Sequence, residues 1–230
     1  MGEKFMYYRG FPNNVPNHNT YISPEDAYLR QQNYNPSYGY VQHNNQPKKC
    51  YTQREVELMR NERSLWEEHV AWTRMAIISL VFNLPDVNFV LARLLKNAED
   101  MGNMFRPIYG DNAANMYAAL IKEHLLIAAD LVKAAIAGDT QAANEAERKW
   151  YENADKIAVF LNSINPFLSV EQVRQMFYQH LALTKQEALY MINKDYEKDI
   201  AIYDQIEKQA REMADMISDA MIKLYPDLRG

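Results

Sequence analysis

Glycine is nearly absent from the chain after residue 50, and this limits the fold more than any other feature. Only three of the seven glycines lie between Tyr51 and Leu224: Gly102, Gly110 and Gly138. Gly110 and Gly138 are each followed directly by an Asp, the pattern of one helix ending and the next beginning at an N-cap. No segment alternates with a period of two, so the body is expected to be all-α.

Prolines indicate the other helix boundaries, and Ser169 with Gln172 forms a capping-box pattern. The predicted helices run from Arg54 to Asn83, Asp86 to Phe105, Asp111 to Ala137, Asp139 to Leu161, Ser169 to Asn193 and Asp195 to Leu224. Short connections make sequence neighbours antiparallel. The predicted fold is therefore an up-and-down helical bundle of about six helices, arranged as three hairpins.

Residues 1 to 50 differ sharply in composition from the rest of the chain. They hold seven Tyr, eight Asn and five of the nine Pro, with few aliphatic residues and no periodicity. Such a segment cannot bury enough apolar surface to become ordered alone. We expect a disordered Tyr/Asn/Pro/Gln-rich tail at 1–50 and a helical bundle domain at 51–230. The tail's composition suits multivalent self-association or tyrosine crosslinking.

Charge and composition exclude several classes of partner. The net charge of −5 includes no basic cluster, which argues against nucleic acid, and no apolar run reaches membrane-spanning length. Cys50 is the only cysteine, so no internal disulfide can form, and no secretory signal pattern is present. A cytoplasmic location is expected. No Gly-rich phosphate loop is found, so no nucleotide is expected.

The three histidines of the body occupy similar places in the predicted hairpins. They are spaced 55 and 56 residues apart, and an Asp that opens the next helix follows each of them after 15 to 17 residues. A carboxylate or amide residue precedes each one, in the pairs Glu68-His69, Glu123-His124 and Gln179-His180. These landmarks indicate an internal repeat of a helical hairpin.

The same three histidines are expected to meet at one height of the bundle. Each lies on an apolar stripe, 13 or 14 residues before the end of its predicted helix. Counting a similar distance along the return helices reaches Asn153 and Glu207. One layer could therefore hold three imidazoles, a carboxylate and an amide.

Two interpretations of this layer stay open. The first is a transition-metal site for Fe or Zn, with His69, His124, His180 and Glu207 as ligands and Asn153 as an outer partner. Glu68 and Glu123 would support the ligands or pair with other helices. The reaction is undefined, and a redox or storage role rests on analogy with ferritin-like bundles. The second is a buried polar network in a structural or interaction protein.

The segments "LWEEHVAWTRMAIISLVFNLPD", "EHLLIAADLVKAAIAGD" and "WYENADKIAVFLNSINP" carry a resemblance to known proteins. From about Leu65 to Pro226 the chain resembles a small family of uncharacterised helical proteins from spore-forming, clostridia-type bacteria. This resemblance implies a spore-associated or coat role, with coat proteins as partners of the N-terminal tail and the spore or mother-cell compartment as a further location. Some relatives carry the label acetylglutamate kinase, which implies a nucleotide-binding α/β fold. The chain has no Gly-rich strand–loop–helix segment to support that activity.

The Glu-His pairs are also distantly similar to a metalloprotein-like bundle family of unknown function. That resemblance implies metal binding by Glu68, His69, Glu123, His124 and His180. In the third pair Gln179 stands where the pattern has an acid. This departure favours a four-ligand mononuclear site over a carboxylate-rich site for two metals.

Overall fold

The computed structural model describes residues 50–225, and every regular element among them is a helix. The helices are α2 (Gln53–Val81), α3 (Val87–Ala137), α4 (Thr140–Ile164), α5 (Val170–Ile192) and α6 (Tyr196–Leu224). The predicted all-α class is confirmed for this part of the chain. The predicted disorder of the tail concerns residues that, except for Cys50, lie outside the described ones. None of the helices described is both long and apolar enough to cross a membrane.

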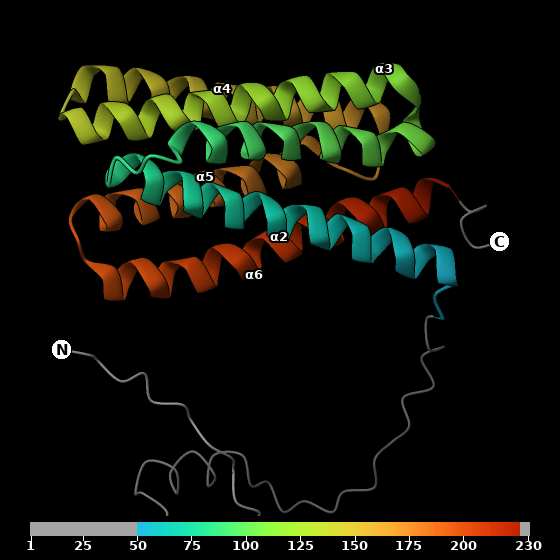
Figure 1. The fold of residues 1–230 in the computed structure, drawn as a ribbon. Helices are drawn as coiled ribbons and strands as arrows, with labels where there is room; N and C mark the ends of the chain where they lie inside the picture. The colour runs from blue at the N-terminus through green and yellow to red at the C-terminus, as the bar shows by residue number, and fades with distance from the viewer. Residues whose placement is uncertain (1–49, 226–230) are drawn as a thin grey trace, which may run out of the picture. The chain divides into compact units, whose positions relative to one another are not determined.

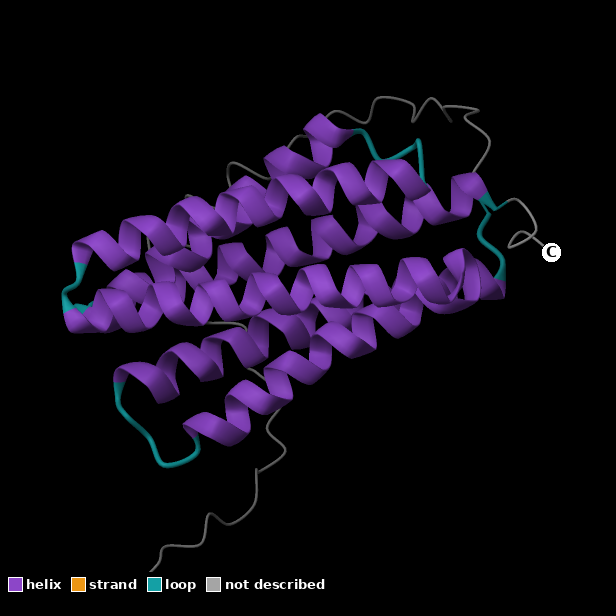
Figure 2. Cartoon of the chain, turned by 90° about the horizontal axis from the view of Figure 1, so that it is seen from above, coloured by secondary structure: helices purple, strands orange, loops and turns teal. Residues whose placement is uncertain are grey.

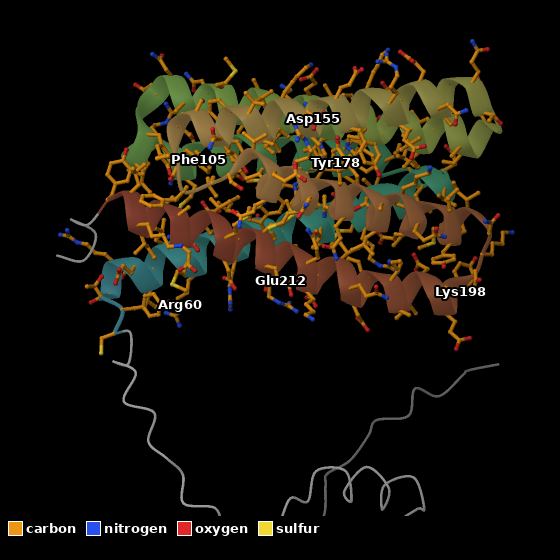
Figure 3. The ribbon with its side chains drawn as sticks, turned by 180° about the vertical axis from the view of Figure 1, so that it is seen from behind. Arg60, Phe105, Asp155, Tyr178, Lys198 and Glu212 are labelled. Atoms are coloured by element: carbon orange, nitrogen blue, oxygen red, sulfur yellow. The ribbon has the colours of Figure 1, made fainter. Side chains whose placement is uncertain are left out.

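Helices that follow one another in the sequence pack side by side, and α6 also packs against α2 (Figures 1 and 2). Side chains fill the space between the ribbons (Figure 3). The largest fully buried ones are aromatic: Trp66, Tyr117, Phe105 and Phe177. Burial of this apolar surface supplies the main driving force for packing the helices together.

Local capping fixes where several helices begin and end. The Ser169 hydroxyl accepts a hydrogen bond from the Gln172 backbone N–H at 3.2 Å, as the capping pattern predicts. Gly138 ends α3 in the left-handed conformation, with φ of 69°. Asp139 then accepts from the Ala142 backbone N–H at 2.9 Å and begins α4. The Gly-Asp signal at this position is therefore confirmed.

The predicted count of six helices is not reproduced, because α3 spans both the second and the third predicted helix. The expected boundary is still visible inside α3 as a single non-helical residue, Gly110, with φ of 81° and ψ of 175°. Glycine tolerates this positive φ without the clash that a Cβ atom would cause. Figure 1 shows α3 turning back on itself, which defines a first arm (87–109) and a second arm (111–137).

Close contacts confirm that the two arms of α3 lie against each other. A Cβ atom built on Gly102 would be 2.7 Å from both the Ala114 carbonyl oxygen and the Ala118 Cβ atom. Residues 102 and 118 would be about 24 Å apart along a straight helix. The rings of Phe105 and Tyr117 also stack across the turn, with centroids 4.1 Å apart. At Gly102 the two arms therefore approach so closely that a side chain on this residue would clash with the second arm.

A partly buried ion cluster ties α2 to α5 and α6. The Arg74 guanidinium donates to Glu187 at 2.7 Å and to Asp199 at 2.5 Å. Both carboxylates are almost fully buried, whereas Arg74 remains partly exposed. Burial raises the pKa of Glu187 to about 7, although Arg74 opposes the shift.

Candidate functional site: a buried histidine layer

The three histidines predicted to meet lie in the interior and close to one another. His69, His124 and His180 are each 2% exposed. The ring centroid of His180 is 5.7 Å from that of His69 and 6.4 Å from that of His124. Helices α2, α3 and α5 thus bring three imidazoles from distant parts of the sequence into one region of the core.

Each histidine contacts the oxygen of a side-chain amide on the helical segment that follows it. The Nδ1 atoms lie 3.1 Å from Asn97 Oδ1 for His69, 2.9 Å from Asn153 Oδ1 for His124 and 3.2 Å from Gln209 Oε1 for His180. The three amides belong to the first arm of α3, to α4 and to α6. They are themselves buried, at 0%, 0% and 2% exposure.

The nitrogen of each amide returns a hydrogen bond to the helix that carries the histidine. It donates to the backbone carbonyl four residues before that histidine: Asn97 to Leu65 at 3.0 Å, Asn153 to Leu120 at 3.1 Å and Gln209 to Met176 at 2.9 Å. A carbonyl in a helix has a second lone pair free to accept such a bond. We call each set of histidine, amide and carbonyl a histidine–amide bridge.

The bridges determine which ring nitrogen carries the proton. Because each amide nitrogen donates to a carbonyl, the amide oxygen faces the histidine and can only accept. Nδ1 is therefore protonated in all three rings, and Nε2 carries the lone pair. In His124 this lone pair accepts a hydrogen bond from Trp150 Nε1 at 3.0 Å, which agrees with the assignment.

All three imidazoles are held in the neutral form. Burial lowers the pKa of His69 to about 4, against the weaker opposing effect of its bond to Asn97. Burial and the nearby His69 lower the pKa of His180 to about 3. Burial, His180 and His69 together hold the pKa of His124 well below its usual range. The layer is thus uncharged at neutral pH, as a densely packed interior requires.

Two of the predicted carboxylates lie away from the imidazoles. Glu207 pairs with Arg211 at 3.2 Å and its side chain is 42% exposed, while Gln209 makes the contact with His180. Glu68 accepts from Arg93 at 2.8 Å, and its side chain is 44% exposed.

Glu123 and Asn153 extend the second bridge towards the surface. Asn153, predicted as an outer partner, donates to Glu123 at 3.0 Å in addition to its bond with the Leu120 carbonyl. Lys156 donates to the other carboxylate oxygen of Glu123 at 3.0 Å. Lys156, followed by Asn153, lowers the pKa of Glu123, so this carboxylate is ionised.

Sequence reasoning misses Asn97 and Gln209, although a signal for them exists. The three amides follow their histidines by 28, 29 and 29 residues. The recurrence of an amide residue 28 or 29 positions after each histidine is the sequence signal for this set. Measuring from the turns instead reached Asn153 correctly but Glu207 in place of Gln209.

No set of three or more His, Cys, Asp or Glu side chains in residues 50–225 is arranged to hold a metal ion. Each histidine uses its Nδ1 atom in a bridge, and His124 also uses Nε2. The Nε2 atoms of His69 and His180 take no part in the bridges, so their lone pairs are the ones that could bind a metal ion. The predicted ligand set of His69, His124, His180 and Glu207 is therefore not assembled around one point.

A buried carboxyl group lies two helical turns before His69. Glu62 is 2% exposed, and neither its Oε1 atom nor the hydroxyl of buried Tyr117 has a hydrogen-bond partner among the described residues. Burial raises the pKa of Glu62 to about 8, so it is mostly protonated at neutral pH. It adds a neutral polar group to the same interior.

Comparisons with known proteins find no matching family model, no matching curated protein and no matching solved structure. The resemblance to a helical family of spore-forming bacteria therefore stays a prediction, as does the distant resemblance to a metalloprotein-like family.

Replacing Asn97 with Leu should lower the free energy of unfolding by about 2 to 4 kcal/mol. The change leaves the His69 Nδ1–H buried without a partner and removes the bond to Leu65. The measurement is urea denaturation at pH 7. The matched control is Asn112→Leu at an exposed position of the same helix, expected to change stability by under about 0.5 kcal/mol. Equal effects of the two substitutions would contradict a stabilising role for the first bridge.

Stability should fall as the pH drops below about 6.5, partly because of His69. The unfolded chain then binds a proton that the folded His69, with its pKa of about 4, does not bind. Between pH 7 and pH 5 this amounts to about 2 kcal/mol lost from the free energy of unfolding. The His69→Gln variant should lack that part of the loss. Glu62 titrates in both proteins, so its contribution to the pH dependence cancels when the variant is compared with the wild type. Identical pH dependence of the two proteins in urea denaturation would refute this account.

Proposed function

We propose that this protein is a non-enzymatic structural or interaction protein whose helical body is a rigid support. The observation that carries the proposal is the set of three histidine–amide bridges. In each bridge both the protonated histidine nitrogen and the amide are satisfied within the fold. A histidine used in this way holds two helical segments in register, and because its pKa is lowered it does not carry the second, titratable proton at neutral pH.

The three bridges also support the interpretation of the body as three repeats of one helical hairpin. The repeats pair α2 with the first arm of α3, the second arm of α3 with α4, and α5 with α6. In each pair the amide bonds both to the histidine and to the carbonyl four residues before it. We infer that the body consists of three copies of this helical hairpin, and that in each copy the histidine–amide bridge links the two helical segments.

We assign binding to other copies of the chain, or to partner proteins, to residues 1–50. This segment is rich in Tyr, Asn and Pro and poor in aliphatic residues, a composition that favours many weak contacts over one packed interface. Self-association, or binding to coat proteins in a spore-forming cell, is the proposed outcome. The body would then present the tail at a fixed place in an assembly.

Deleting residues 1–50 should abolish assembly of the full chain into larger particles and leave the body helical. Sedimentation velocity measures the assembly, and far-ultraviolet circular dichroism measures the helix content. Cys50→Ser in the full chain is the control, because Cys50 is an exposed free cysteine that could crosslink two chains. Unchanged assembly of the truncated protein would refute the role of the tail. Loss of helix content would show that the body depends on it.

Binding of one transition metal, Fe or Zn, is the second candidate function. The observation in its favour is that Nδ1 protonation leaves the Nε2 lone pairs of His69 and His180 available, with ring centroids 5.7 Å apart. Histidines that bind metals commonly donate their other N–H to an oxygen, as these do to amides. His124 could join them only by giving up its bond from Trp150.

Titration with Co²⁺ and Zn²⁺ distinguishes the two candidates. The structural proposal predicts no stoichiometric binding and no visible Co²⁺ absorption bands of a tetrahedral site. A metal site would give one equivalent of bound ion and a higher melting temperature. Both should then be lost in His180→Gln and kept in Glu207→Gln, because Glu207 lies outside the layer.

A further inference from the structure

A mostly apolar cavity of about 120 Å³ lies one to two helical turns beyond the histidine layer, between α2, α3, α4 and α5. Its walls include Thr73, Ala76, Leu94, Ala128, Trp150 and Thr184. Thr73, Ala128 and Thr184 each follow a bridge histidine by four residues. The cavity therefore begins about one helical turn from the histidine layer, measured along the bundle. We propose that this cavity is a binding site for a small, neutral, largely hydrocarbon molecule that carries one hydrogen-bonding group.

The size of the cavity sets the size of the ligand. Cavities of about 150 Å³ lined by aliphatic and aromatic side chains stay free of water and hold a molecule such as benzene. Water is a poor occupant here, because it needs two or more polar partners and the walls offer few. A single six-membered ring with one small substituent is therefore about the largest molecule expected to enter without rearrangement.

One hydroxyl in the wall defines the polar group of the ligand. Thr184 is 5% exposed, and its Oγ1 atom has no hydrogen-bond partner among residues 50–225. The equivalent hydroxyl of Thr73 is already used, since it donates to the His69 carbonyl at 2.7 Å. A buried hydroxyl without a partner is costly. The Oγ1 atom itself is almost inaccessible, so a ligand with one hydroxyl or carbonyl group would satisfy it once the Thr184 side chain turns its hydroxyl towards the cavity.

The charged residues of the wall favour a neutral ligand. Lys185 on α5 donates to both carboxylate oxygens of Glu147 on α4, at 2.7 and 2.6 Å. Both side chains line the cavity and keep partial exposure to solvent, so they mark its side towards water. Because each charge is neutralised by the other, an anion or cation would gain no pairing energy unless it broke this ion pair.

Trp150 connects the cavity to the histidine layer. Its indole ring lines the cavity, and its Nε1–H donates to Nε2 of His124. A molecule in the cavity would therefore contact a side chain that donates a hydrogen bond to the histidine of the second bridge. Indole fluorescence is sensitive to such contacts and gives a direct readout of occupancy.

The test titrates the full chain with benzene, phenol and benzoate, following tryptophan fluorescence and melting temperature. Benzene and phenol should bind saturably and raise the melting temperature, with phenol binding more tightly, and benzoate should not bind. Thr184→Val removes the hydroxyl and keeps the shape, so it should weaken phenol about fivefold and change benzene less than twofold. Absence of saturable binding of both neutral probes to the wild-type protein overturns the proposal.

Filling the cavity locates the site independently of the hydroxyl. Ala128→Leu and Ala188→Leu add a large side chain from two different walls, on the second arm of α3 and on α5. Each should weaken both neutral probes at least tenfold, and having two variants keeps the test valid if one of them fails to fold. Unchanged phenol binding in a folded filled variant would place the probe elsewhere and overturn the assignment. The proposed structural role of the protein does not depend on this outcome.

Discussion

The contact between a protonated histidine nitrogen and a side-chain amide oxygen is the constraint on which the rest of the core depends. Imidazoles and amides are expensive to bury unless every polar atom has a partner. The three bridges meet that condition for Nδ1 and for both ends of the amide, within one pair of helical segments each. The apolar side chains around them can then pack closely without leaving a charge in the interior.

Neutrality and geometry support each other in this layer. Burial holds all three histidine pKa values below the usual range, and the proximity of His69 to His180 lowers the latter further. A proton added to one ring would place a positive charge beside two other imidazoles in a medium that solvates it poorly. The same arrangement that satisfies the hydrogen bonds therefore makes the interior sensitive to acid.

Much of the helical architecture was predictable from the sequence, because glycine, proline and capping residues act locally. The Gly138-Asp139 signal and the Ser169 cap are where the pattern indicates. The inward position of the histidines also follows from helical periodicity. Gly110 was identified as a break, yet the helix continues on both sides of it, since one residue of positive φ suffices to reverse the chain.

The partners of the histidines were harder to predict, because they depend on the rotation of neighbouring helices. An error of one residue along a helix turns a side chain by about 100°, and an error of two nearly reverses it. The choice of Glu207 in place of Gln209 is an error of this kind. The cavity beside Trp150 and Thr184 was not predictable either, because packing defects have no pattern in a single sequence.

The reversal at Gly110 has a consequence for how this sequence can change in length. One helix, α3, supplies Asn97 to the first bridge on one arm and His124 to the second bridge on the other. Inserting or deleting a single residue within either arm between them would rotate one of these side chains out of the core. The two helical stretches on either side of Gly110, residues 97–109 and 111–124, are thus segments of fixed length. Natural or engineered insertions should be tolerated at the connections between helices rather than inside them.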